Sequence, residues 1–318
     1  SCHLQKPKQP LYFTATTPST LPVRSAHHGG LLVFGAEKVI PPAKIPYPKP
    51  PLSFDDQLRK LKSRGMSVAD DAQALHYLSQ LNYYRLGAYW LPFEQSHQSH
   101  QFKPGTTFER VVEHYVFDRE LRLLVLDAIE RVEVAIRTRW AYVLGHKYGA
   151  HAHLQSGLFK ASWNYGQNRQ KLEDEYQGNR EGFVQHIRGT YNEPLPPVWA
   201  QVELFSFGQL SKWYANLSSG QDRNAILMPF DFDEVNFVSS MHHLSAIRNV
   251  CAHHGRLWNR DFTFTFKLPR HRPRGLVAAL NSAQSRKLYI TLAALVYLLD
   301  VSCPGHHWRK RLTALMDG

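Results

Sequence analysis

Several features that mark common classes of enzyme are missing from this sequence of 318 residues. Its three cysteines, Cys2, Cys251 and Cys303, form no C-x-x-C pair, so neither a disulfide framework nor a cysteine-based zinc site is expected. There is no H-E-x-x-H motif, no glycine-rich phosphate loop, no nucleophile elbow and no strand-like alternation of useful length. These absences leave helices as the main expected element.

The sequence also lacks long apolar runs and has few acidic residues, which bears on its partners and its compartment. No apolar run approaches the ~20 residues that a membrane-spanning helix needs, so we expect no membrane partner. Acidic residues are outnumbered, 26 against 38 Lys and Arg, which gives a net charge of +12. A surplus of this size favours a polyanion such as RNA, although an ordinary basic surface is the alternative. The cysteine usage fits the reducing cytoplasm.

Proline, glycine and apolar periodicity divide the chain into segments. Residues 1–50 are rich in proline and lack a helical period, which predicts a flexible leader followed by one all-α domain over residues 51–318. Residues 106–144 contain neither Gly nor Pro and predict one very long helix or two helices divided near Asp118. Residues 198–217, after two prolines, predict a single apolar helix.

The stretch SSMHHLSAIRNVCAHHGRLWNRDF, residues 239–262, gathers polar side chains at helical spacing and predicts a helix over about 239–258. On such a helix Asn249 and His253 share a face, and Arg256 follows on that face. Arg248 and His253 diverge by roughly 140°. If both act on one phosphate, the arginine must curl around the helix, or another helix or subunit must complete the pocket.

The string Arg248-Asn249-Val250-Cys251-Ala252-His253 resembles the R-x4–6-H signature of the HEPN superfamily of all-helical ribonucleases and nucleotide-binding proteins. The longer string RNVCAHHGRLWNR is similar to the Abi-like family of abortive-infection proteins, of the AbiD and AbiF type. The resemblance extends over roughly residues 50–269, including LNYYRLGAYWLPF and FDRELRLLVLDAIERVEVAIRTRW. It implies a HEPN-like helical bundle with additional N-terminal helices.

The resemblance also implies a metal-independent endoribonuclease of bacterial phage defence that acts like a toxin. RNA carries its own nucleophile, the 2′-OH, so the protein needs no metal and no cofactor. Arg248, Asn249 and His253 are the implied catalytic residues, with Arg256 in support. Because the superfamily builds its site from two motif copies and one is present, the implied state is a homodimer through the motif helix. A neutralising antitoxin or a regulatory RNA is a further implied partner.

Other readings remain open. Glu133 and Arg137, four residues apart, form either a structural ion pair or a polar edge of the phosphate pocket. The basic strip of Lys267, Arg270, Arg272 and Arg274 either binds RNA or is solvated surface.

His254 is a second histidine candidate for the site. The histidine pairs invite a metal-hydrolase reading, but His242 and His253 would lie ~16 Å apart on a helix, too far for one ion. A non-catalytic RNA-binding or regulatory protein is the main alternative to the nuclease.

Overall fold

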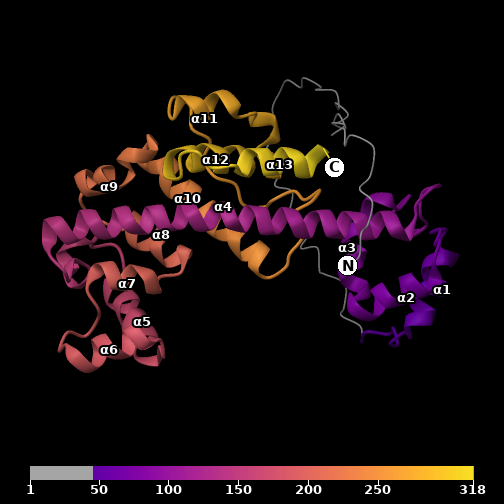
Figure 1. The fold of residues 1–318 in the computed structure, drawn as a ribbon, viewed down its shortest axis with the longest axis horizontal. Helices are drawn as coiled ribbons and strands as arrows, with labels where there is room; N and C mark the ends of the chain where they lie inside the picture. The colour runs from indigo at the N-terminus through magenta and orange to yellow at the C-terminus, as the bar shows by residue number, and fades with distance from the viewer. Residues whose placement is uncertain (1–45, 318) are drawn as a thin grey trace, which may run out of the picture. The chain divides into compact units, whose positions relative to one another are not determined.

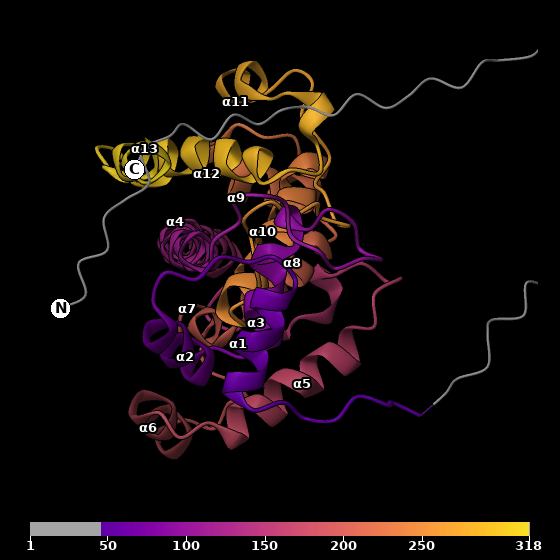
Figure 2. The same ribbon diagram turned by 90° about the vertical axis from the view of Figure 1, so that its right-hand side faces the viewer.

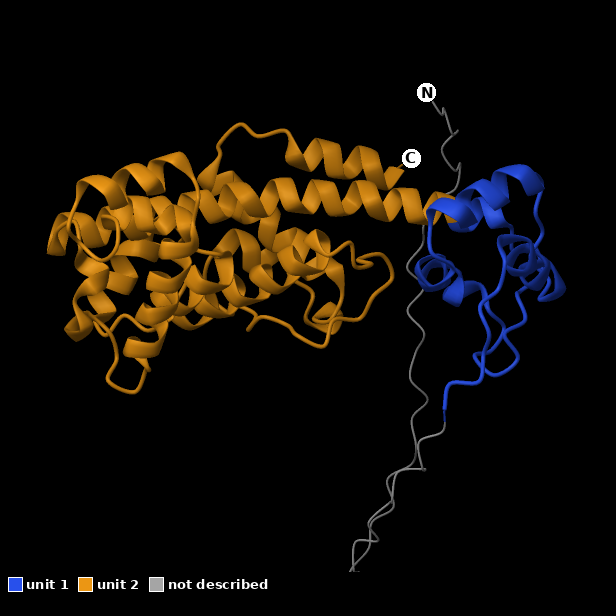
Figure 3. Ribbon diagram, turned by 90° about the horizontal axis from the view of Figure 1, so that it is seen from below, with its two compact units in different colours: residues 1–111 blue, residues 112–318 orange. Residues whose placement is uncertain are grey.

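The computed structural model describes residues 46–317, so most of the expected leader lies outside the described residues. Within the described range the chain forms thirteen α-helices and five short 3-10 helices, with isolated β-bridges but no strand. The expected all-α fold is confirmed. Figure 3 colours two compact units, residues 1–111 and 112–318, and the prediction of one helical domain over residues 51–318 stays a prediction.

The first unit contains three capped helices. They are α1 (Phe54–Ser63), α2 (Asp71–Gln80) and α3 (Tyr83–Trp90), and the 3-10 helix η1 (Leu91–Phe93) follows. Ser53, Asp70 and Asn82 cap the three helices, because each side chain accepts a hydrogen bond from an otherwise unpaired amide of the first turn. Tyr89 and Trp90, in the aromatic segment LNYYRLGAYWLPF, are buried and form part of the core of this unit.

A single helix, α4 (Phe108–Tyr148), runs unbroken for 41 residues, which decides between the one-helix and two-helix predictions. Its buried apolar side chains recur every three or four residues: Leu121, Leu124, Val125, Ala128, Ile129, Val132, Ile136 and Trp140. Asp118 does not interrupt the helix, because its carboxylate is buried and paired with Arg122 one turn later.

The second unit is built around α4, which Figures 1 and 2 show from the side and nearly end-on. Its further helices are α5 (Tyr165–Gly178), α6 (Gly182–Thr190), α7 (Val198–Leu204), α8 (Phe207–Ala215), α9 (Gly220–Leu227), α10 (Glu234–Ala252), α11 (Arg274–Ala279), α12 (Leu288–Ser302) and α13 (Trp308–Asp317). The 3-10 helices are η2 (Ala152–Leu154), η3 (Ser156–Leu158), η4 (Met228–Phe230) and η5 (Ser282–Gln284). Both views place α12 and α13 along one side of α4, where the Trp308 indole N–H donates to the carbonyl of Leu124 at 2.7 Å.

The predicted apolar helix over residues 198–217 is divided into α7 and α8. The break falls at Phe205 and Ser206, where Ser206 forms a capping box with Gln209. The carbonyl of Phe205 accepts a hydrogen bond from Arg137 at 2.6 Å. A side chain of α4 therefore pairs with a carbonyl at the end of α7 that has no partner within the helix.

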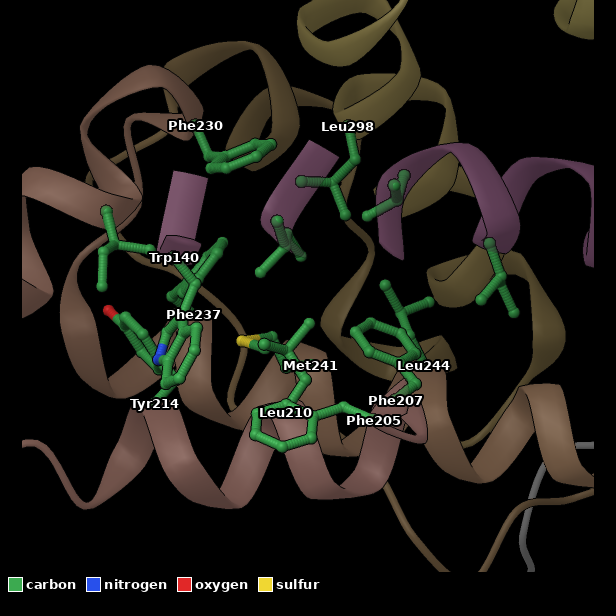
Figure 4. Packing of buried hydrophobic residues seen from close by; sticks show 14 of the residues in the cluster. Trp140, Phe205, Phe207, Leu210, Tyr214, Phe230, Phe237, Met241, Leu244 and Leu298 are labelled. Atoms are coloured by element: carbon green, nitrogen blue, oxygen red, sulfur yellow. The ribbon is translucent and has the colours of Figure 1, made fainter. Parts of the chain in front are cut away.

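The core of the second unit joins α4, α8, α10 and α12. Figure 4 shows Phe207, Leu210 and Tyr214 of α8 packing against Phe237 and Met241 of α10. Along the described residues, no helix has both the length and the apolar character required to cross a bilayer.

Candidate active site at the end of helix α10

Helix α10 presents the motif by burying one face and leaving its last turn accessible. Asp233 caps its start, and Phe237, Met241, Leu244 and Ile247 are buried. The remaining buried members are polar or small: Ser240, His243, Ser245 and Cys251. Because the helix is fixed by this buried face, the positions of its exposed residues are set by the core.

The helix ends at Ala252, earlier than the predicted boundary near 258. His253 is the C-cap, and His254 adopts a left-handed conformation with φ of 58°. The amide of His254 donates to Cys251, and that of Gly255 donates to Val250 at 2.7 Å. This pattern is a Schellman ending, with histidine where glycine is usual. Arg256 therefore lies in a loop and not on the helical face shared by Asn249 and His253.

Gly255 is required for this close turn. A Cβ atom at that position would lie 3.0 Å from Cγ1 and 3.1 Å from the carbonyl oxygen of Val250. A side chain would therefore push the loop away from the helix end. The glycine holds the RLWNR segment against the last turn of α10.

The predicted catalytic residues all lie at this end of α10. Asn249 and His253 are exposed, whereas Arg248 is half-buried. The Arg248 guanidinium donates to the Asn249 side-chain oxygen at 3.4 Å, a long contact that leaves most of its donors available to a phosphate. Burial raises the pKa of the Cys251 thiol to about 12, so Cys251 is no nucleophile at neutral pH.

A buried carboxylate on α4 holds the loop that follows the motif. Asp118 Oδ1 accepts hydrogen bonds from the backbone amides of Leu257 at 3.0 Å and Trp258 at 2.6 Å. Its other oxygen pairs with Arg122, and the ring of His114 lies 4.4 Å from that of Trp258. Hydrogen bonds therefore join the FDRELR segment to the RLWNR string, 139 residues away.

Sequence reasoning did not assign a role to Asp118, Arg122 or His114. The local signal is that Asp118 and Arg122 stand four residues apart, a spacing that favours an ion pair on a helix. This spacing reveals neither the burial of the pair nor the segment that it contacts.

Glu133 and Arg137 have a different environment. Arg137 pairs with Glu133 and donates to the backbone carbonyls of Glu203 at 3.1 Å and Phe205 at 2.6 Å. These contacts join α4 to α7, and Arg137 lies about 28 Å along α4 from Asp118 at 1.5 Å per residue. They favour the structural reading of the pair, and its role at the pocket stays a prediction.

The basic strip is exposed but distant from the motif. The side chains of Lys267, Arg270, Arg272 and Arg274 are all exposed. The Lys267 amide donates to Ser239, which places the start of the strip about 15 Å along α10 from Asn249. Arg272 and Arg274 border an open pocket of about 550 Å³, together with Asp231, His271 and Tyr297. The motif end and the strip are therefore two separate accessible basic regions.

Comparisons with known proteins give one match. The family model for Abi-like protein matches residues 76–259, more than half of the chain, and includes the FDRELR segment and the motif as far as Asn259. No curated protein and no solved structure matches.

Proposed function

The chain belongs to the Abi-like family, whose name points to abortive infection, a form of phage defence, and on this basis we propose that it is a metal-independent endoribonuclease. The observation that carries the proposal is the grouping at the end of α10. An exposed histidine, His253, stands at the C-cap, and Arg248 and Asn249 lie one turn earlier. The HEPN superfamily, to which the motif is similar, implies RNA as the substrate.

The proposed reaction uses the RNA's own 2′-OH. This hydroxyl attacks the adjacent phosphorus, the bond to the 5′ oxygen breaks, and a 2′,3′-cyclic phosphate and a free 5′-OH result. His253 moves a proton, either from the attacking hydroxyl or to the leaving oxygen, a task suited to imidazole. Arg248 places its fixed positive charge on the phosphorane oxygens, and Asn249 orients the arginine or a phosphate oxygen.

The loop after the helix has a positioning role in this proposal. Asp118 holds the amides of Leu257 and Trp258, so the segment containing Arg256 is fixed relative to α10. A site of this kind needs its groups held within a fraction of an ångström of the productive geometry. The buried anchor supplies that rigidity without contacting substrate.

Incubation of the purified protein with total cellular RNA in EDTA, followed by mapping of cleaved ends, tests the proposal. We expect 2′,3′-cyclic phosphate ends from the wild type and loss of cleavage for Arg248→Ala and for His253→Ala. His242→Ala is the matched control, because His242 is an exposed histidine on the same helix. If His253→Ala cleaves at the wild-type rate, the catalytic assignment is wrong.

The exposed basic strip favours one alternative, a non-catalytic RNA-binding protein. In that case the wild type binds RNA in the same assay but produces no new ends. Cleavage that EDTA abolishes would instead indicate a metal hydrolase. The three outcomes are distinguished by the same experiment.

A further inference from the structure

A second group of chemically active side chains lies in the first unit, outside the motif. The loop between η1 and α4 carries the spacing E-x2-H-x2-H, with Glu94, His97 and His100. A β-bridge between Glu94 and Phe102 closes the loop. Inside it the Gln95 amide donates to Gln101 at 2.8 Å, so the loop has its own backbone bonds.

The three side chains converge on one point. Glu94 Oε2 lies 3.3 Å from Nδ1 of His97 and 3.6 Å from Nδ1 of His100. All three atoms lie within 4.8 Å of one another. These separations are long for charge-assisted hydrogen bonds, which are about 2.7–2.9 Å. The two distances from Glu94 Oε2 match the edges of a tetrahedron around Zn²⁺, about 3.3–3.6 Å for bonds of 2.0–2.2 Å.

The carboxylate at the base of the group is built into the unit. The Glu94 side chain is 4% exposed, and its other oxygen, Oε1, pairs with Arg64. Arg64 also donates to the carbonyl of His100 at 2.5 Å and to the Tyr83 hydroxyl at 3.3 Å. Arg64 thus fixes one oxygen of Glu94 and leaves the second facing the two imidazoles. Outer-shell partners of this kind orient metal ligands in known sites.

We propose that Glu94, His97 and His100 form a zinc-binding site with a fourth position open to water. Two imidazoles and one carboxylate suit Zn²⁺ better than Mg²⁺ or Ca²⁺, which favour oxygen ligands alone. Both histidines are exposed, so an ion reaches the site from solvent. The bound ion joins the loop to the buried Glu94 and stiffens residues 94–102. This site is separate from the proposed nuclease and does not depend on it.

Zinc titration of the EDTA-stripped, untagged full chain by calorimetry tests the site. We expect one tight zinc ion per chain. The double variant His97→Gln/His100→Gln should weaken that binding by at least about 100-fold, more than the 10–100-fold cost of losing an outer-shell partner. Both histidines are exposed, so the variant should keep the fold.

His76→Gln is the matched control, because His76 is an exposed histidine of α2 in the same unit. It should bind zinc like the wild type. A wild type that binds zinc no more tightly than the double variant would overturn the site. RNA cleavage in EDTA is measured separately, so failure of the zinc site and failure of the nuclease proposal give different results.

Discussion

The carboxylate of Asp118, wholly buried on α4, accepts a hydrogen bond from the backbone amide of Trp258 at 2.6 Å. The contact joins the middle of the chain to the segment directly after the motif. It accounts for the fixed course of the loop beyond α10. It also makes the candidate site depend on a residue of α4 that lies outside the motif.

We expect Asp118→Asn to destabilise the protein by about 3 kcal/mol, because it removes the carboxylate that Arg122 faces in the core. RNA cleavage should fall more than the loss of folded protein explains, since the loop is released. Urea unfolding and the cleavage rate at low temperature measure the two effects. Asp127→Asn is the control: it pairs with Arg131 on the same helix at a more exposed position and should cost less than about 1 kcal/mol. Equal effects of the two substitutions would contradict the anchoring role.

The second prediction concerns His243, on the buried face of α10. Burial is the main cause that lowers its pKa to about 4; a hydrogen bond to the backbone of Phe264 opposes this shift, and the neighbouring His242 lowers the pKa by a smaller amount. An unfolded chain binds the proton near pH 6.5, before the folded protein does. Stability due to neutral His243 is therefore fully present above pH 6.5 and is lost as pH falls towards 4, by about 3 kcal/mol.

His243→Phe removes this titration, and the rings of Phe262, Phe264 and Phe266 around the site accept an aromatic side chain. The difference in urea midpoint between pH 7.5 and pH 5 should therefore be smaller in the variant. His76→Gln, at an exposed histidine of α2, should leave the difference unchanged. A pH dependence in His243→Phe as steep as in the wild type would mean that other groups carry it.

Much of the architecture follows from local signals. The absence of Gly and Pro over residues 106–144 predicts one long helix or two, and the structure contains the single α4; the apolar period identifies its buried residues. The division between α7 and α8 was missed, although Ser206 and Gln209 have the spacing of a capping box. The apolar pattern continues across the break, and the contact that stabilises it comes from Arg137, far away in sequence.

The candidate site was predictable only in part. The R-N-x-x-x-H string located Arg248, Asn249 and His253, but the helix was extended past Gly255 because the apolar period continues through Leu257 and Trp258. Those two residues are placed by Asp118, a contact over about 140 positions that no local pattern reveals. The E-x2-H-x2-H spacing around Glu94 is neither an adjacent histidine pair nor an H-E-x-x-H motif, so the patterns considered for a metal did not single it out.

The third prediction concerns the basic strip of Lys267, Arg270, Arg272 and Arg274. If it binds phosphates, replacing all four by Gln should weaken RNA binding evenly across sequences. The steepness of log affinity against log salt should fall by about 3, because each phosphate contact on a single strand contributes ~0.7 and four contacts are lost. All four side chains are exposed, so the fold should be retained. An unchanged slope would assign the strip to solvated surface.

The last prediction is the dimer. Arg248 and His253 are five residues apart at the end of α10, a spacing that corresponds to roughly 140° on a straight helix, so we infer that a second copy of the motif completes the pocket. We expect two copies of the motif end to face each other across a two-fold axis, an isologous contact in which each pocket draws on both chains. Sedimentation should then give the mass of a dimer, and specific activity should fall on dilution below the dissociation constant.

Mixed chains test how the pocket is shared. When an Arg248→Ala chain is combined with a His253→Ala chain, a pocket that needs one Arg and one His from opposite chains recovers part of one site. A pocket that needs all four side chains recovers nothing, so the mixing experiment is read together with the mass. A strict monomer that keeps full cleavage at nanomolar concentration would refute the composite site. The partner of His253 would then have to come from the same chain, with Arg256 in the anchored loop as the first residue to substitute.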